Sequence, residues 1–453
     1  MRACVVAERQ GIPAVPVVAS GFIRQFKATA RGMKLADIKI AEYPGVIPND
    51  SDETFTSKVN EFVVPAVLEA LGSGRDGMSG QAAAAKSVPD DQIVVRGDLD
   101  AIQEAFISRN WSDGLPVIPP TPDRVERFLD HAGRAPDDVL GVLMPACRAA
   151  TVRSVAVNGV MAGCRPEYMP LLIAIVECIA DPQYALQHAG ATPGWEALAI
   201  VSGPIVKQLG FESGTGLMRV GTQANSSVGR FLRLVTRNIA GLIPGQTDKG
   251  TIGFTFNVVM AEDPHVLSDM GWPSYGMDRG FQQGQSMVTV QSVVTIGQPA
   301  YTSGSTPEDH LEMLTYYFQA AIGPWAFTAL TKPEFHPLVL LSPSTAATFA
   351  KAGWTKDRLR QHLRDNARIS ARLIVKCAWD TGNKHVDIAR QVELGITPPD
   401  YVLSDDPERL VPVCPYAHQI SIVVAGDPGR NQSKMYVNNH NQGIPTSRPV
   451  ILR

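Results

Sequence analysis

The sequence lacks the short motifs that mark several common classes of protein. It has six cysteines in 453 residues and no CxxC pair, which favours reduced thiols over a disulfide framework. Its nine histidines form no HExxH or similar ligand pattern, and we find neither a dinucleotide-binding fingerprint nor a P-loop. The sequence therefore carries no metal or nucleotide signature, and it leaves the cofactors unknown. A metal held by residues far apart in the sequence would leave no such signature.

Long apolar runs and a strong charge of one sign are also missing. The net charge is −3, with 44% hydrophobic and 19% charged residues, and this balance creates no field that attracts nucleic acid or a membrane surface. No run reaches the roughly 18 apolar residues of a membrane-spanning helix. The first residues are broken by Glu8, Arg9, Gln10 and two prolines, so they do not resemble a signal peptide. We therefore expect a cytoplasmic protein that binds neither nucleic acid nor membranes.

The length of the chain favours more than one domain, since single cores rarely extend beyond about 250–300 residues. The first part of the chain alternates between β-branched runs and helical spacing, which predicts strand 13–19, helix 21–34, strand 38–44 and a helix over 54–72 that is interrupted near Pro65. This order predicts a small parallel three-layer α/β domain over residues 1–72. Residues 73–95 have the composition of a flexible linker. Residues 96–453 are expected to form a larger mixed α/β domain.

Periodicity and capping signals give the expected elements of the larger domain. Thr121 followed by Pro122 predicts a helix start, and Thr355 is expected to cap another helix. The expected helices cover residues 98–110, 122–132, 224–240, 310–323 and 355–368. The expected strands cover residues 197–203, 251–263, 287–297 and 336–343. Residues 268–281, with Trp272 and Tyr275, are expected to form a loop that either covers a pocket or serves the fold alone.

The stretch 141–170 combines small and apolar residues with arginines and two cysteines. Cys147 and Cys164 are followed directly by Arg148 and Arg165, and a nearby guanidinium favours thiolate over thiol. Both cysteines are therefore candidate nucleophiles. The alternative is a buried helix with inert cysteines, because free cysteine commonly packs as a small hydrophobe. Polar residues in this stretch need partners from the fold or from a ligand, and the candidate substrate-binding residues are Arg148, Arg153, Asn158 and Arg165.

Three arginines share one face of the expected helix 224–240, because Arg230, Arg233 and Arg237 are three and four residues apart. Asn225 lies at the start of this helix and Asn238 lies beside the arginine row. The row is either a solvated basic face or a cationic wall that grips a carboxylate or phosphate. In the second interpretation Asn225, Arg230, Arg237 and Asn238 bind substrate.

Acidic residues after the strand 251–263 supply the candidate general bases. Glu262 and Asp263 close this strand, and Asp278 lies in the following loop beside Arg279. We assign Glu262 and Asp278 as candidate bases and Arg279 as a candidate substrate-binding residue. His440 is flanked by asparagines and is expected at the surface rather than in a site.

The phrase AERQGIPAVPVVAS, followed by a helix and by a strand ending in Tyr-Pro, resembles the UGSC family and, more distantly, the selenoprotein B subunit of glycine reductase. The residues that carry this match are Glu8, Arg9, Gly11, Ile12 and Pro13. In those proteins a redox motif of selenocysteine or cysteine, Gly, Ser and Cys precedes the matching phrase. Here that motif would lie before Met1, so either the chain starts upstream of Met1 or the fold is kept without this chemistry.

The larger domain resembles the domain that accompanies UGSC proteins. The matching phrases include WSDGLPVIPPTPDRVERFL, NGVMAGCRPEYMP and NSSVGRFLRLVTRNIAGLIPG, and the related sequences have an acid, Arg, Gly and Phe at the positions of residues 278–281. The resemblance implies that a redox cysteine or selenocysteine of the small domain attacks a substrate, and that Cys147 or Cys164 resolves the adduct. It also implies a redox partner protein.

Three functions are compatible with these features. The first is an enzyme that acts on a small anionic organic substrate by cysteine-based thiol or redox chemistry, with Cys164 or Cys147 as nucleophile. The second is a lyase or hydrolase with Glu262 or Asp278 as base and an arginine clamp. The third is a non-catalytic subunit of a reductase-type complex. We favour the first, and a homo-oligomer is compatible with all three.

Overall fold

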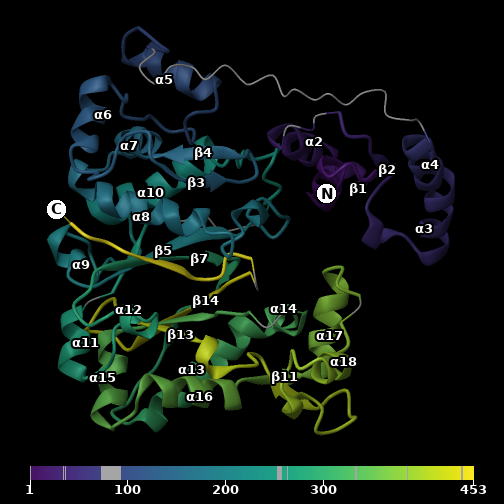
Figure 1. Ribbon diagram of the computed structural model, residues 1–453. Helices are drawn as coiled ribbons and strands as arrows, with labels where there is room; N and C mark the ends of the chain where they lie inside the picture. The colour runs from purple at the N-terminus through teal and green to yellow at the C-terminus, as the bar shows by residue number, and fades with distance from the viewer. Residues whose placement is uncertain are drawn as a thin grey trace.

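The computed structural model describes residues 2–33, 35, 37–72, 93–251, 258–262, 264–331, 334–384, 386–439 and 442–452 (Figure 1). The chain is a mixed α/β protein, as the sequence predicted. Most of the expected linker 73–95 lies outside the described residues, as do Asp263 and His440. No helix among the described residues is long and apolar enough to cross a membrane.

The N-terminal unit has the predicted alternation of strands and helices, with β1 (Val17–Ala19) parallel to β2 (Ala41–Tyr43). Its helices are α1 (Arg2–Arg9), α2 (Ile23–Gly32), α3 (Asp52–Lys58) and α4 (Val64–Gly72). The helix α1 was not expected from the sequence. A π-helical turn over Val59–Val63 joins α3 to α4. It lies directly before Pro65, whose missing N–H and ring disfavour a regular α-helical turn.

Helix α2 holds the N-terminal unit against the rest of the chain. The side-chain amide of Gln25 donates to the carbonyl oxygens of Gly190 (3.0 Å) and Thr247 (3.1 Å). The Lys249 ammonium lies 3.6 Å from the centre of the Phe22 ring, a cation–π contact. At the end of α2, a side chain at position 32 would place its Cβ 2.7 Å from a carbonyl oxygen, so this approach requires glycine.

The larger unit contains two mixed sheets and the helices that cover them (Figure 1). Its helices are α5 (Leu99–Ser108), α6 (Pro122–Leu129), α7 (Val152–Ala162), α8 (Met169–Ala180), α9 (Ile205–Gln208), α10 (Gln223–Asn238), α11 (Pro264–Met270), α12 (Tyr275–Asp278), α13 (Pro307–Ile322), α14 (Phe327–Thr331), α15 (Pro343–Lys351), α16 (Lys356–Asn366), α17 (Ala371–Asp380) and α18 (Ile388–Glu393). Its strands are β3 (Val139–Leu143), β4 (Arg148–Thr151), β5 (Glu196–Ser202), β6 (Met260–Ala261), β7 (Met287–Val293), β8 (Thr295–Ile296), β9 (Ala300–Tyr301), β10 (Leu338–Leu341), β11 (Arg368–Ser370), β12 (Leu410–Pro412), β13 (Ser421–Val424), β14 (Gln432–Val437) and β15 (Thr446–Pro449).

The first sheet has the order β15-β7-β5-β6, in which β7 is antiparallel to β5 and β15, and β6 is parallel to β5. Every residue of β7 is buried, including the polar Thr289, Gln291 and Ser292. The second sheet has the order β13-β10-β14-β8, with β9 also paired to β14. Helix α8 packs on β7 and β15 and also contacts α7 and α10. These three helices and the hairpin β3–β4 surround most of the candidate residues.

Two expectations about local structure need correction. Residues 268–281 are not an irregular loop, since they contain the end of α11 and all of α12, although Ser268, Ser274 and Met277 line a cavity of about 510 Å³. Trp272 and Tyr275 are buried, and the Trp272 indole N–H donates to the carbonyl oxygen of Trp354 (2.7 Å), so both residues serve the core. The helix starting at Pro122 ends at Leu129 rather than at residue 132. The expected cap at Thr355 is confirmed, because its hydroxyl accepts from the main-chain N–H of Arg358 (3.1 Å).

Candidate functional site

Cys164 follows α7 and is a core residue. A reciprocal capping box between Thr151 and Ser154 starts this helix, and Gly163 ends it in the left-handed conformation with φ 81°. The Cys164 side chain is buried, and burial raises its pKa to about 12. Arg165 does not offset this rise, since its Nε donates to Oε1 of Gln223 (2.8 Å). The geometry therefore favours the packing role over the nucleophilic role for Cys164.

Cys147 has a different environment. It lies in the turn between β3 and β4, is half-buried, and has a left-handed backbone with φ 55°. Its Sγ lies 3.2 Å from Sδ of Met144. The next residue, Arg148, is exposed, and its Nη1 donates to the carbonyl oxygen of Asn238 (2.7 Å). Of the two predicted nucleophiles, Cys147 is the one with a partly accessible side chain.

Three of the predicted polar residues meet where β4, α7 and α10 pack together. Nδ2 of Asn238 donates to Oδ1 of Asn158 (2.9 Å) and to the carbonyl oxygen of Trp111 (3.0 Å). Asn158 in turn donates to the carbonyl oxygen of Ser154 (2.9 Å). Because Arg148 donates to the main-chain carbonyl oxygen of Asn238, these three residues form one hydrogen-bond network. The bonds above satisfy the Asn238 amide nitrogen and the Asn158 side chain, whereas the buried Oδ1 of Asn238 has no hydrogen-bond partner among the described residues. The network therefore positions Arg148 rather than forming a binding surface of its own.

The arginines of α10 mostly hold the segment 110–116. Arg230 forms a bidentate pair with Asp113 through bonds of 2.8 and 2.9 Å. Arg237 donates to the carbonyl oxygen and to Oδ1 of Asn110, both at 3.1 Å. Arg233 turns instead to the carboxylate of Glu196. The row is therefore neither a freely solvated face nor an open cationic wall.

Asn225, Arg279 and Arg153 have other local partners. The Asn225 side chain is fully buried. Its Oδ1 accepts from the main-chain N–H of Glu212, and its Nδ2 donates to the carbonyl oxygens of Glu212 and Val259 (2.9 Å each). Nη2 of Arg279 donates to the carbonyl oxygen of Pro445 (2.8 Å). Arg153 lies with its Nε 4.0 Å from Asp137 and borders an apolar cavity of about 390 Å³ on the α5 and α6 side of α7. These three residues do not share a site with Arg148.

The two candidate bases belong to one buried network with Lys356. Glu262 accepts from the Ser202 hydroxyl (2.9 Å) and from the main-chain N–H of Tyr275 (2.6 Å). Lys356 Nζ lies 3.1 Å from Asp278 and 3.9 Å from Glu262. Burial raises the pKa of Glu262, and the Lys356 ammonium opposes this rise. Because this network joins the two sheets and its oxygens have partners, it is better suited to stabilising the fold than to catalysis.

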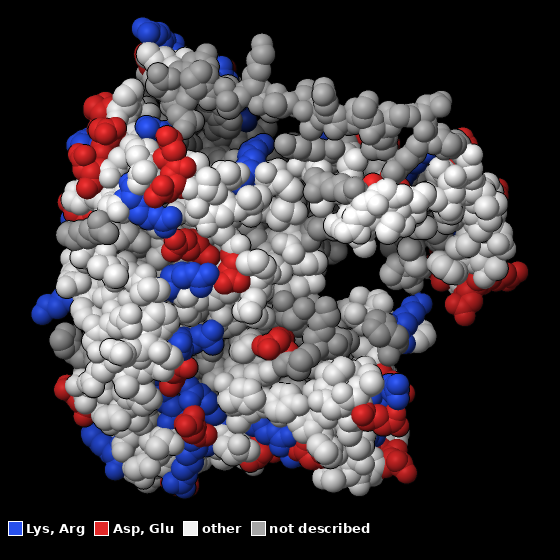
Figure 2. All heavy atoms as spheres, in the orientation of Figure 1, with Lys and Arg blue, Asp and Glu red and all other residues white. Residues whose placement is uncertain are grey.

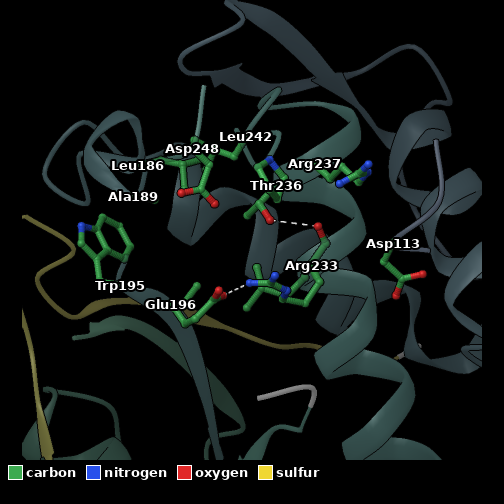
Figure 3. Close-up of a pocket in the computed structure, with 13 residues that line it drawn as sticks. Asp113, Leu186, Ala189, Trp195, Glu196, Arg233, Thr236, Arg237, Leu242 and Asp248 are labelled. Carbon is green, nitrogen blue, oxygen red and sulfur yellow. Dashed lines mark hydrogen bonds and ion pairs between the residues drawn. The ribbon is translucent and has the colours of Figure 1, made fainter. Parts of the chain in front are cut away.

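A polar cavity of about 140 Å³ lies between α10, β5 and the segment 242–248 (Figure 3). The sequence reasoning missed its two main acids, Glu196 and Asp248. Burial raises the pKa of both carboxyl groups, and Arg233 opposes the rise at each. Acids that are 52 positions apart and belong to no motif leave no signal in a single sequence.

A second opening, a cleft of about 510 Å³, separates α2 from the turn between β3 and β4. Arg24, Lys27 and Arg31 line it from one face of α2, since they are three and four residues apart, and Arg148 lines it from the other side. Within the described part of the chain, none of these four side chains has an Asp or Glu oxygen within 4.0 Å. We call this opening the cationic cleft. Helical spacing was the sequence signal that could have revealed its α2 face.

The cationic cleft and Cys147 are adjacent in the chain, because Pro145, Ala146 and Arg148 all line the cleft. On the face shown in Figure 2, acidic and basic side chains are interspersed. Among the described residues, no group of three or more His, Cys, Asp or Glu side chains is arranged to hold a metal ion. Comparisons with protein-family models, curated proteins and solved structures find no match to this chain.

Proposed function

We propose that this protein is an enzyme that binds a small organic anion in the cationic cleft and attacks it with the thiolate of Cys147. The observation that supports this proposal most directly is the set of four cationic side chains, contributed by both units, that surround one cleft and have no carboxylate within 4.0 Å in the described part of the chain. Unpaired guanidinium groups bind carboxylates and phosphates through parallel N–H bonds. The volume of about 510 Å³ is in the range of small-molecule sites.

The substrate is a carboxylate or phosphate ester with an electrophilic carbon. The three cations of α2 extend over about 10 Å, from position 24 to position 31 at 1.5 Å per residue. An anion held against them and against Arg148 lies beside the β3–β4 turn that carries Cys147. The clustered positive charge attracts the anion from solution and also favours the thiolate form of a nearby cysteine.

The reaction step is a nucleophilic attack by sulfur. The thiol proton of Cys147 passes to solvent, and the thiolate electron pair forms a C–S bond with the electrophilic carbon. The leaving group departs with the electron pair of the bond that breaks, so the step needs no oxidant or reductant. The electrophilic carbon is an acyl carbon, so the adduct is a thioester of Cys147, and water attacks its carbonyl to release the acid and restore the thiol. Cys164 has no part in this step, because its thiol is buried in the core.

We also propose kinship with UGSC-like proteins for the N-terminal unit. Its parallel β1–α2–β2 arrangement supports this proposal, since Glu8, Arg9, Gly11, Ile12 and Pro13 precede β1 and are followed by a helix and by a strand ending at Tyr43, the order in which the resemblance runs. Under this proposal a redox partner protein would approach the side of the cleft formed by α2.

The test is a turnover screen with matched variants. Wild-type protein is assayed against a panel of small thioesters and other activated acyl compounds that carry a free carboxylate or phosphate, each with its uncharged amide or methyl ester analogue. We expect turnover of anionic members only, with loss of activity in Cys147→Ser and retention in Cys164→Ser. Arg148→Gln should raise KM more than it lowers kcat, because it removes a binding charge. Full activity in Cys147→Ser, or equal turnover of the neutral analogues, would contradict the proposal.

A further inference from the structure

The cavity in Figure 3 is separate from the cationic cleft, although one segment forms a wall of each. Leu242, Pro244 and Asp248 line the cavity, whereas Ile243 and Thr247 from the same segment line the cleft. The cavity has a volume of about 140 Å³, which equals the liquid volume of about four or five water molecules. It is therefore large enough for an organic molecule of a few heavy atoms.

In the part of the chain that the structure describes, one carboxylate at this cavity, that of Asp248, has no cationic side chain in direct contact. Glu196 is paired with Arg233, and Asp113 at the rim is paired with Arg230, which faces away from the cavity lining. Asp248 bonds through Oδ1 to the main-chain N–H of Gly250 (2.8 Å). Among the described residues, no Lys or Arg nitrogen lies within 4.0 Å of the Asp248 carboxylate.

Arg237 does not fill this role, although it lines the cavity. Its guanidinium bonds to Asn110, and Figure 3 shows its side chain extending away from Asp248. The Asp248 carboxylate instead points toward the space between Trp195 and Thr236 (Figure 3). Arg233 opposes the rise in the pKa of Asp248, but its guanidinium is paired with Glu196. A half-buried carboxylate with no cation in direct contact is costly, so a bound cation would stabilise it.

The remaining lining is apolar and aromatic. The Trp195 indole forms one wall, and indole faces are the best aromatic partners for ammonium groups. The other apolar lining residues are Leu186, Ala189, Ala197, Leu232, Leu242 and Pro244. A hydrated inorganic ion gains little from such walls, whereas an ammonium group with a short alkyl chain can contact both the carboxylate and the apolar surface.

We propose that this cavity binds a small organic cation, a primary or N-methylated amine of a few heavy atoms, with its ammonium group on Asp248 and its alkyl part against Trp195. The site is distinct from the cationic cleft, which selects the opposite charge. Occupation of the cavity also fixes the segment that carries Lys249, whose ammonium contacts Phe22 of the N-terminal unit.

Calorimetric titration of the full chain tests this proposal. Ethanolamine is the probe, and ethylene glycol is its uncharged counterpart of equal size. The test variant is Asp248→Asn, which keeps the shape of the side chain and the acceptor for Gly250. The control is Asp427→Asn, because Asp427 makes the same turn, accepting from the main-chain N–H of Gly429 at 2.8 Å, outside the cavity.

We expect ethanolamine, and not ethylene glycol, to bind the wild type and the Asp427→Asn variant. Asp248→Asn should weaken ethanolamine binding about tenfold or more. Ala189→Leu fills part of the cavity without changing its charge, and it should block binding. A single cooperative unfolding transition in this variant, even one at a lower denaturant concentration than in the wild type, separates site loss from misfolding. Equal binding of ethylene glycol, unchanged affinity in Asp248→Asn, or no binding of ethanolamine to the wild type would each overturn the proposal.

Discussion

Replacing Lys356 by Met should lower the free energy of unfolding more than replacing any exposed lysine. The Lys356 side chain is 1% exposed and faces two carboxylates, Asp278 at 3.1 Å and Glu262 at 3.9 Å. It also donates to the carbonyl oxygen of Ile422 (3.2 Å). Methionine fills a similar volume but leaves the fully buried Glu262 carboxylate without a cation and the carbonyl with one bond fewer.

The expected cost follows from this arrangement. Removing one partner of a buried ion pair costs about 3–5 kcal/mol. Arg360 stays at 2.7 Å from Asp278 and continues to neutralise that acid, so the lower end of the range, about 3 kcal/mol, is expected. The matched control is Lys376→Met, because Lys376 is 58% exposed in its pair with Asp380. That pair should contribute less than about 1 kcal/mol.

Urea unfolding followed by circular dichroism measures both variants against the wild type. The loss of unfolding free energy in Lys356→Met, relative to the wild type, should become smaller as the pH falls toward the ordinary glutamate pKa of about 4. Burial raises the pKa of Glu262, and a protonated Glu262 no longer needs the ammonium group. Adding Glu262→Gln to Lys356→Met should recover part of the loss. Equal losses for Lys356→Met and Lys376→Met would refute the structural role of this network.

Three further predictions concern other parts of the chain. Native-state alkylation followed by peptide mass spectrometry should label Cys147 and spare the buried thiols of Cys164, Cys178 and Cys414. Burial raises the pKa of each of these three thiols to about 12. Early labelling of any of them would contradict their core placement. Because burial raises the pKa of Asp248, its contribution to stability is present below about pH 4 and is lost as the pH rises through the folded-state pKa. The melting temperature of the wild type relative to Asp248→Asn should therefore fall with rising pH, and an opposite slope would exclude this assignment. Asp113→Asn should lower the free energy of unfolding by about 1–3 kcal/mol, because it weakens the contact between Arg230 and the segment 110–116. A smaller loss than that of an exposed-acid control would contradict the anchoring role of Arg230.

Local sequence signals predicted much of the secondary structure. The alternation in the N-terminal unit, the cap at Thr355 and the position of strand β7 all depend on neighbouring residues, so periodicity and capping rules were sufficient. The error over residues 268–281 arose because glycines and polar residues suggested an open loop. Trp272 instead finds its partner on Trp354, 82 positions later, which no local pattern can indicate.

The candidate site was predictable only in part, for the same reason. Adjacency in the sequence suggested that Arg165 activates Cys164, but the chain turns after Gly163 and sends the guanidinium to Gln223. The arginine row of α10 was correctly placed on one face, yet its partners lie far away in the sequence, as Asp113 does at 117 positions from Arg230. Tertiary packing decides which charges are neutralised, and hence which remain free to bind a ligand.

The rate ratio of iodoacetate to iodoacetamide at Cys147 tests the central claim most directly. The two reagents alkylate the same thiol, but only iodoacetate carries a charge, so the ratio measures how strongly the cationic cleft attracts a small organic anion. Cys377, a partly exposed thiol away from the cleft, serves as the internal reference. We predict a higher ratio at Cys147 than at Cys377 at low salt, reduced by added salt and by combined Arg24→Gln and Arg148→Gln substitutions. Equal ratios at the two cysteines, unchanged by salt, would contradict the account.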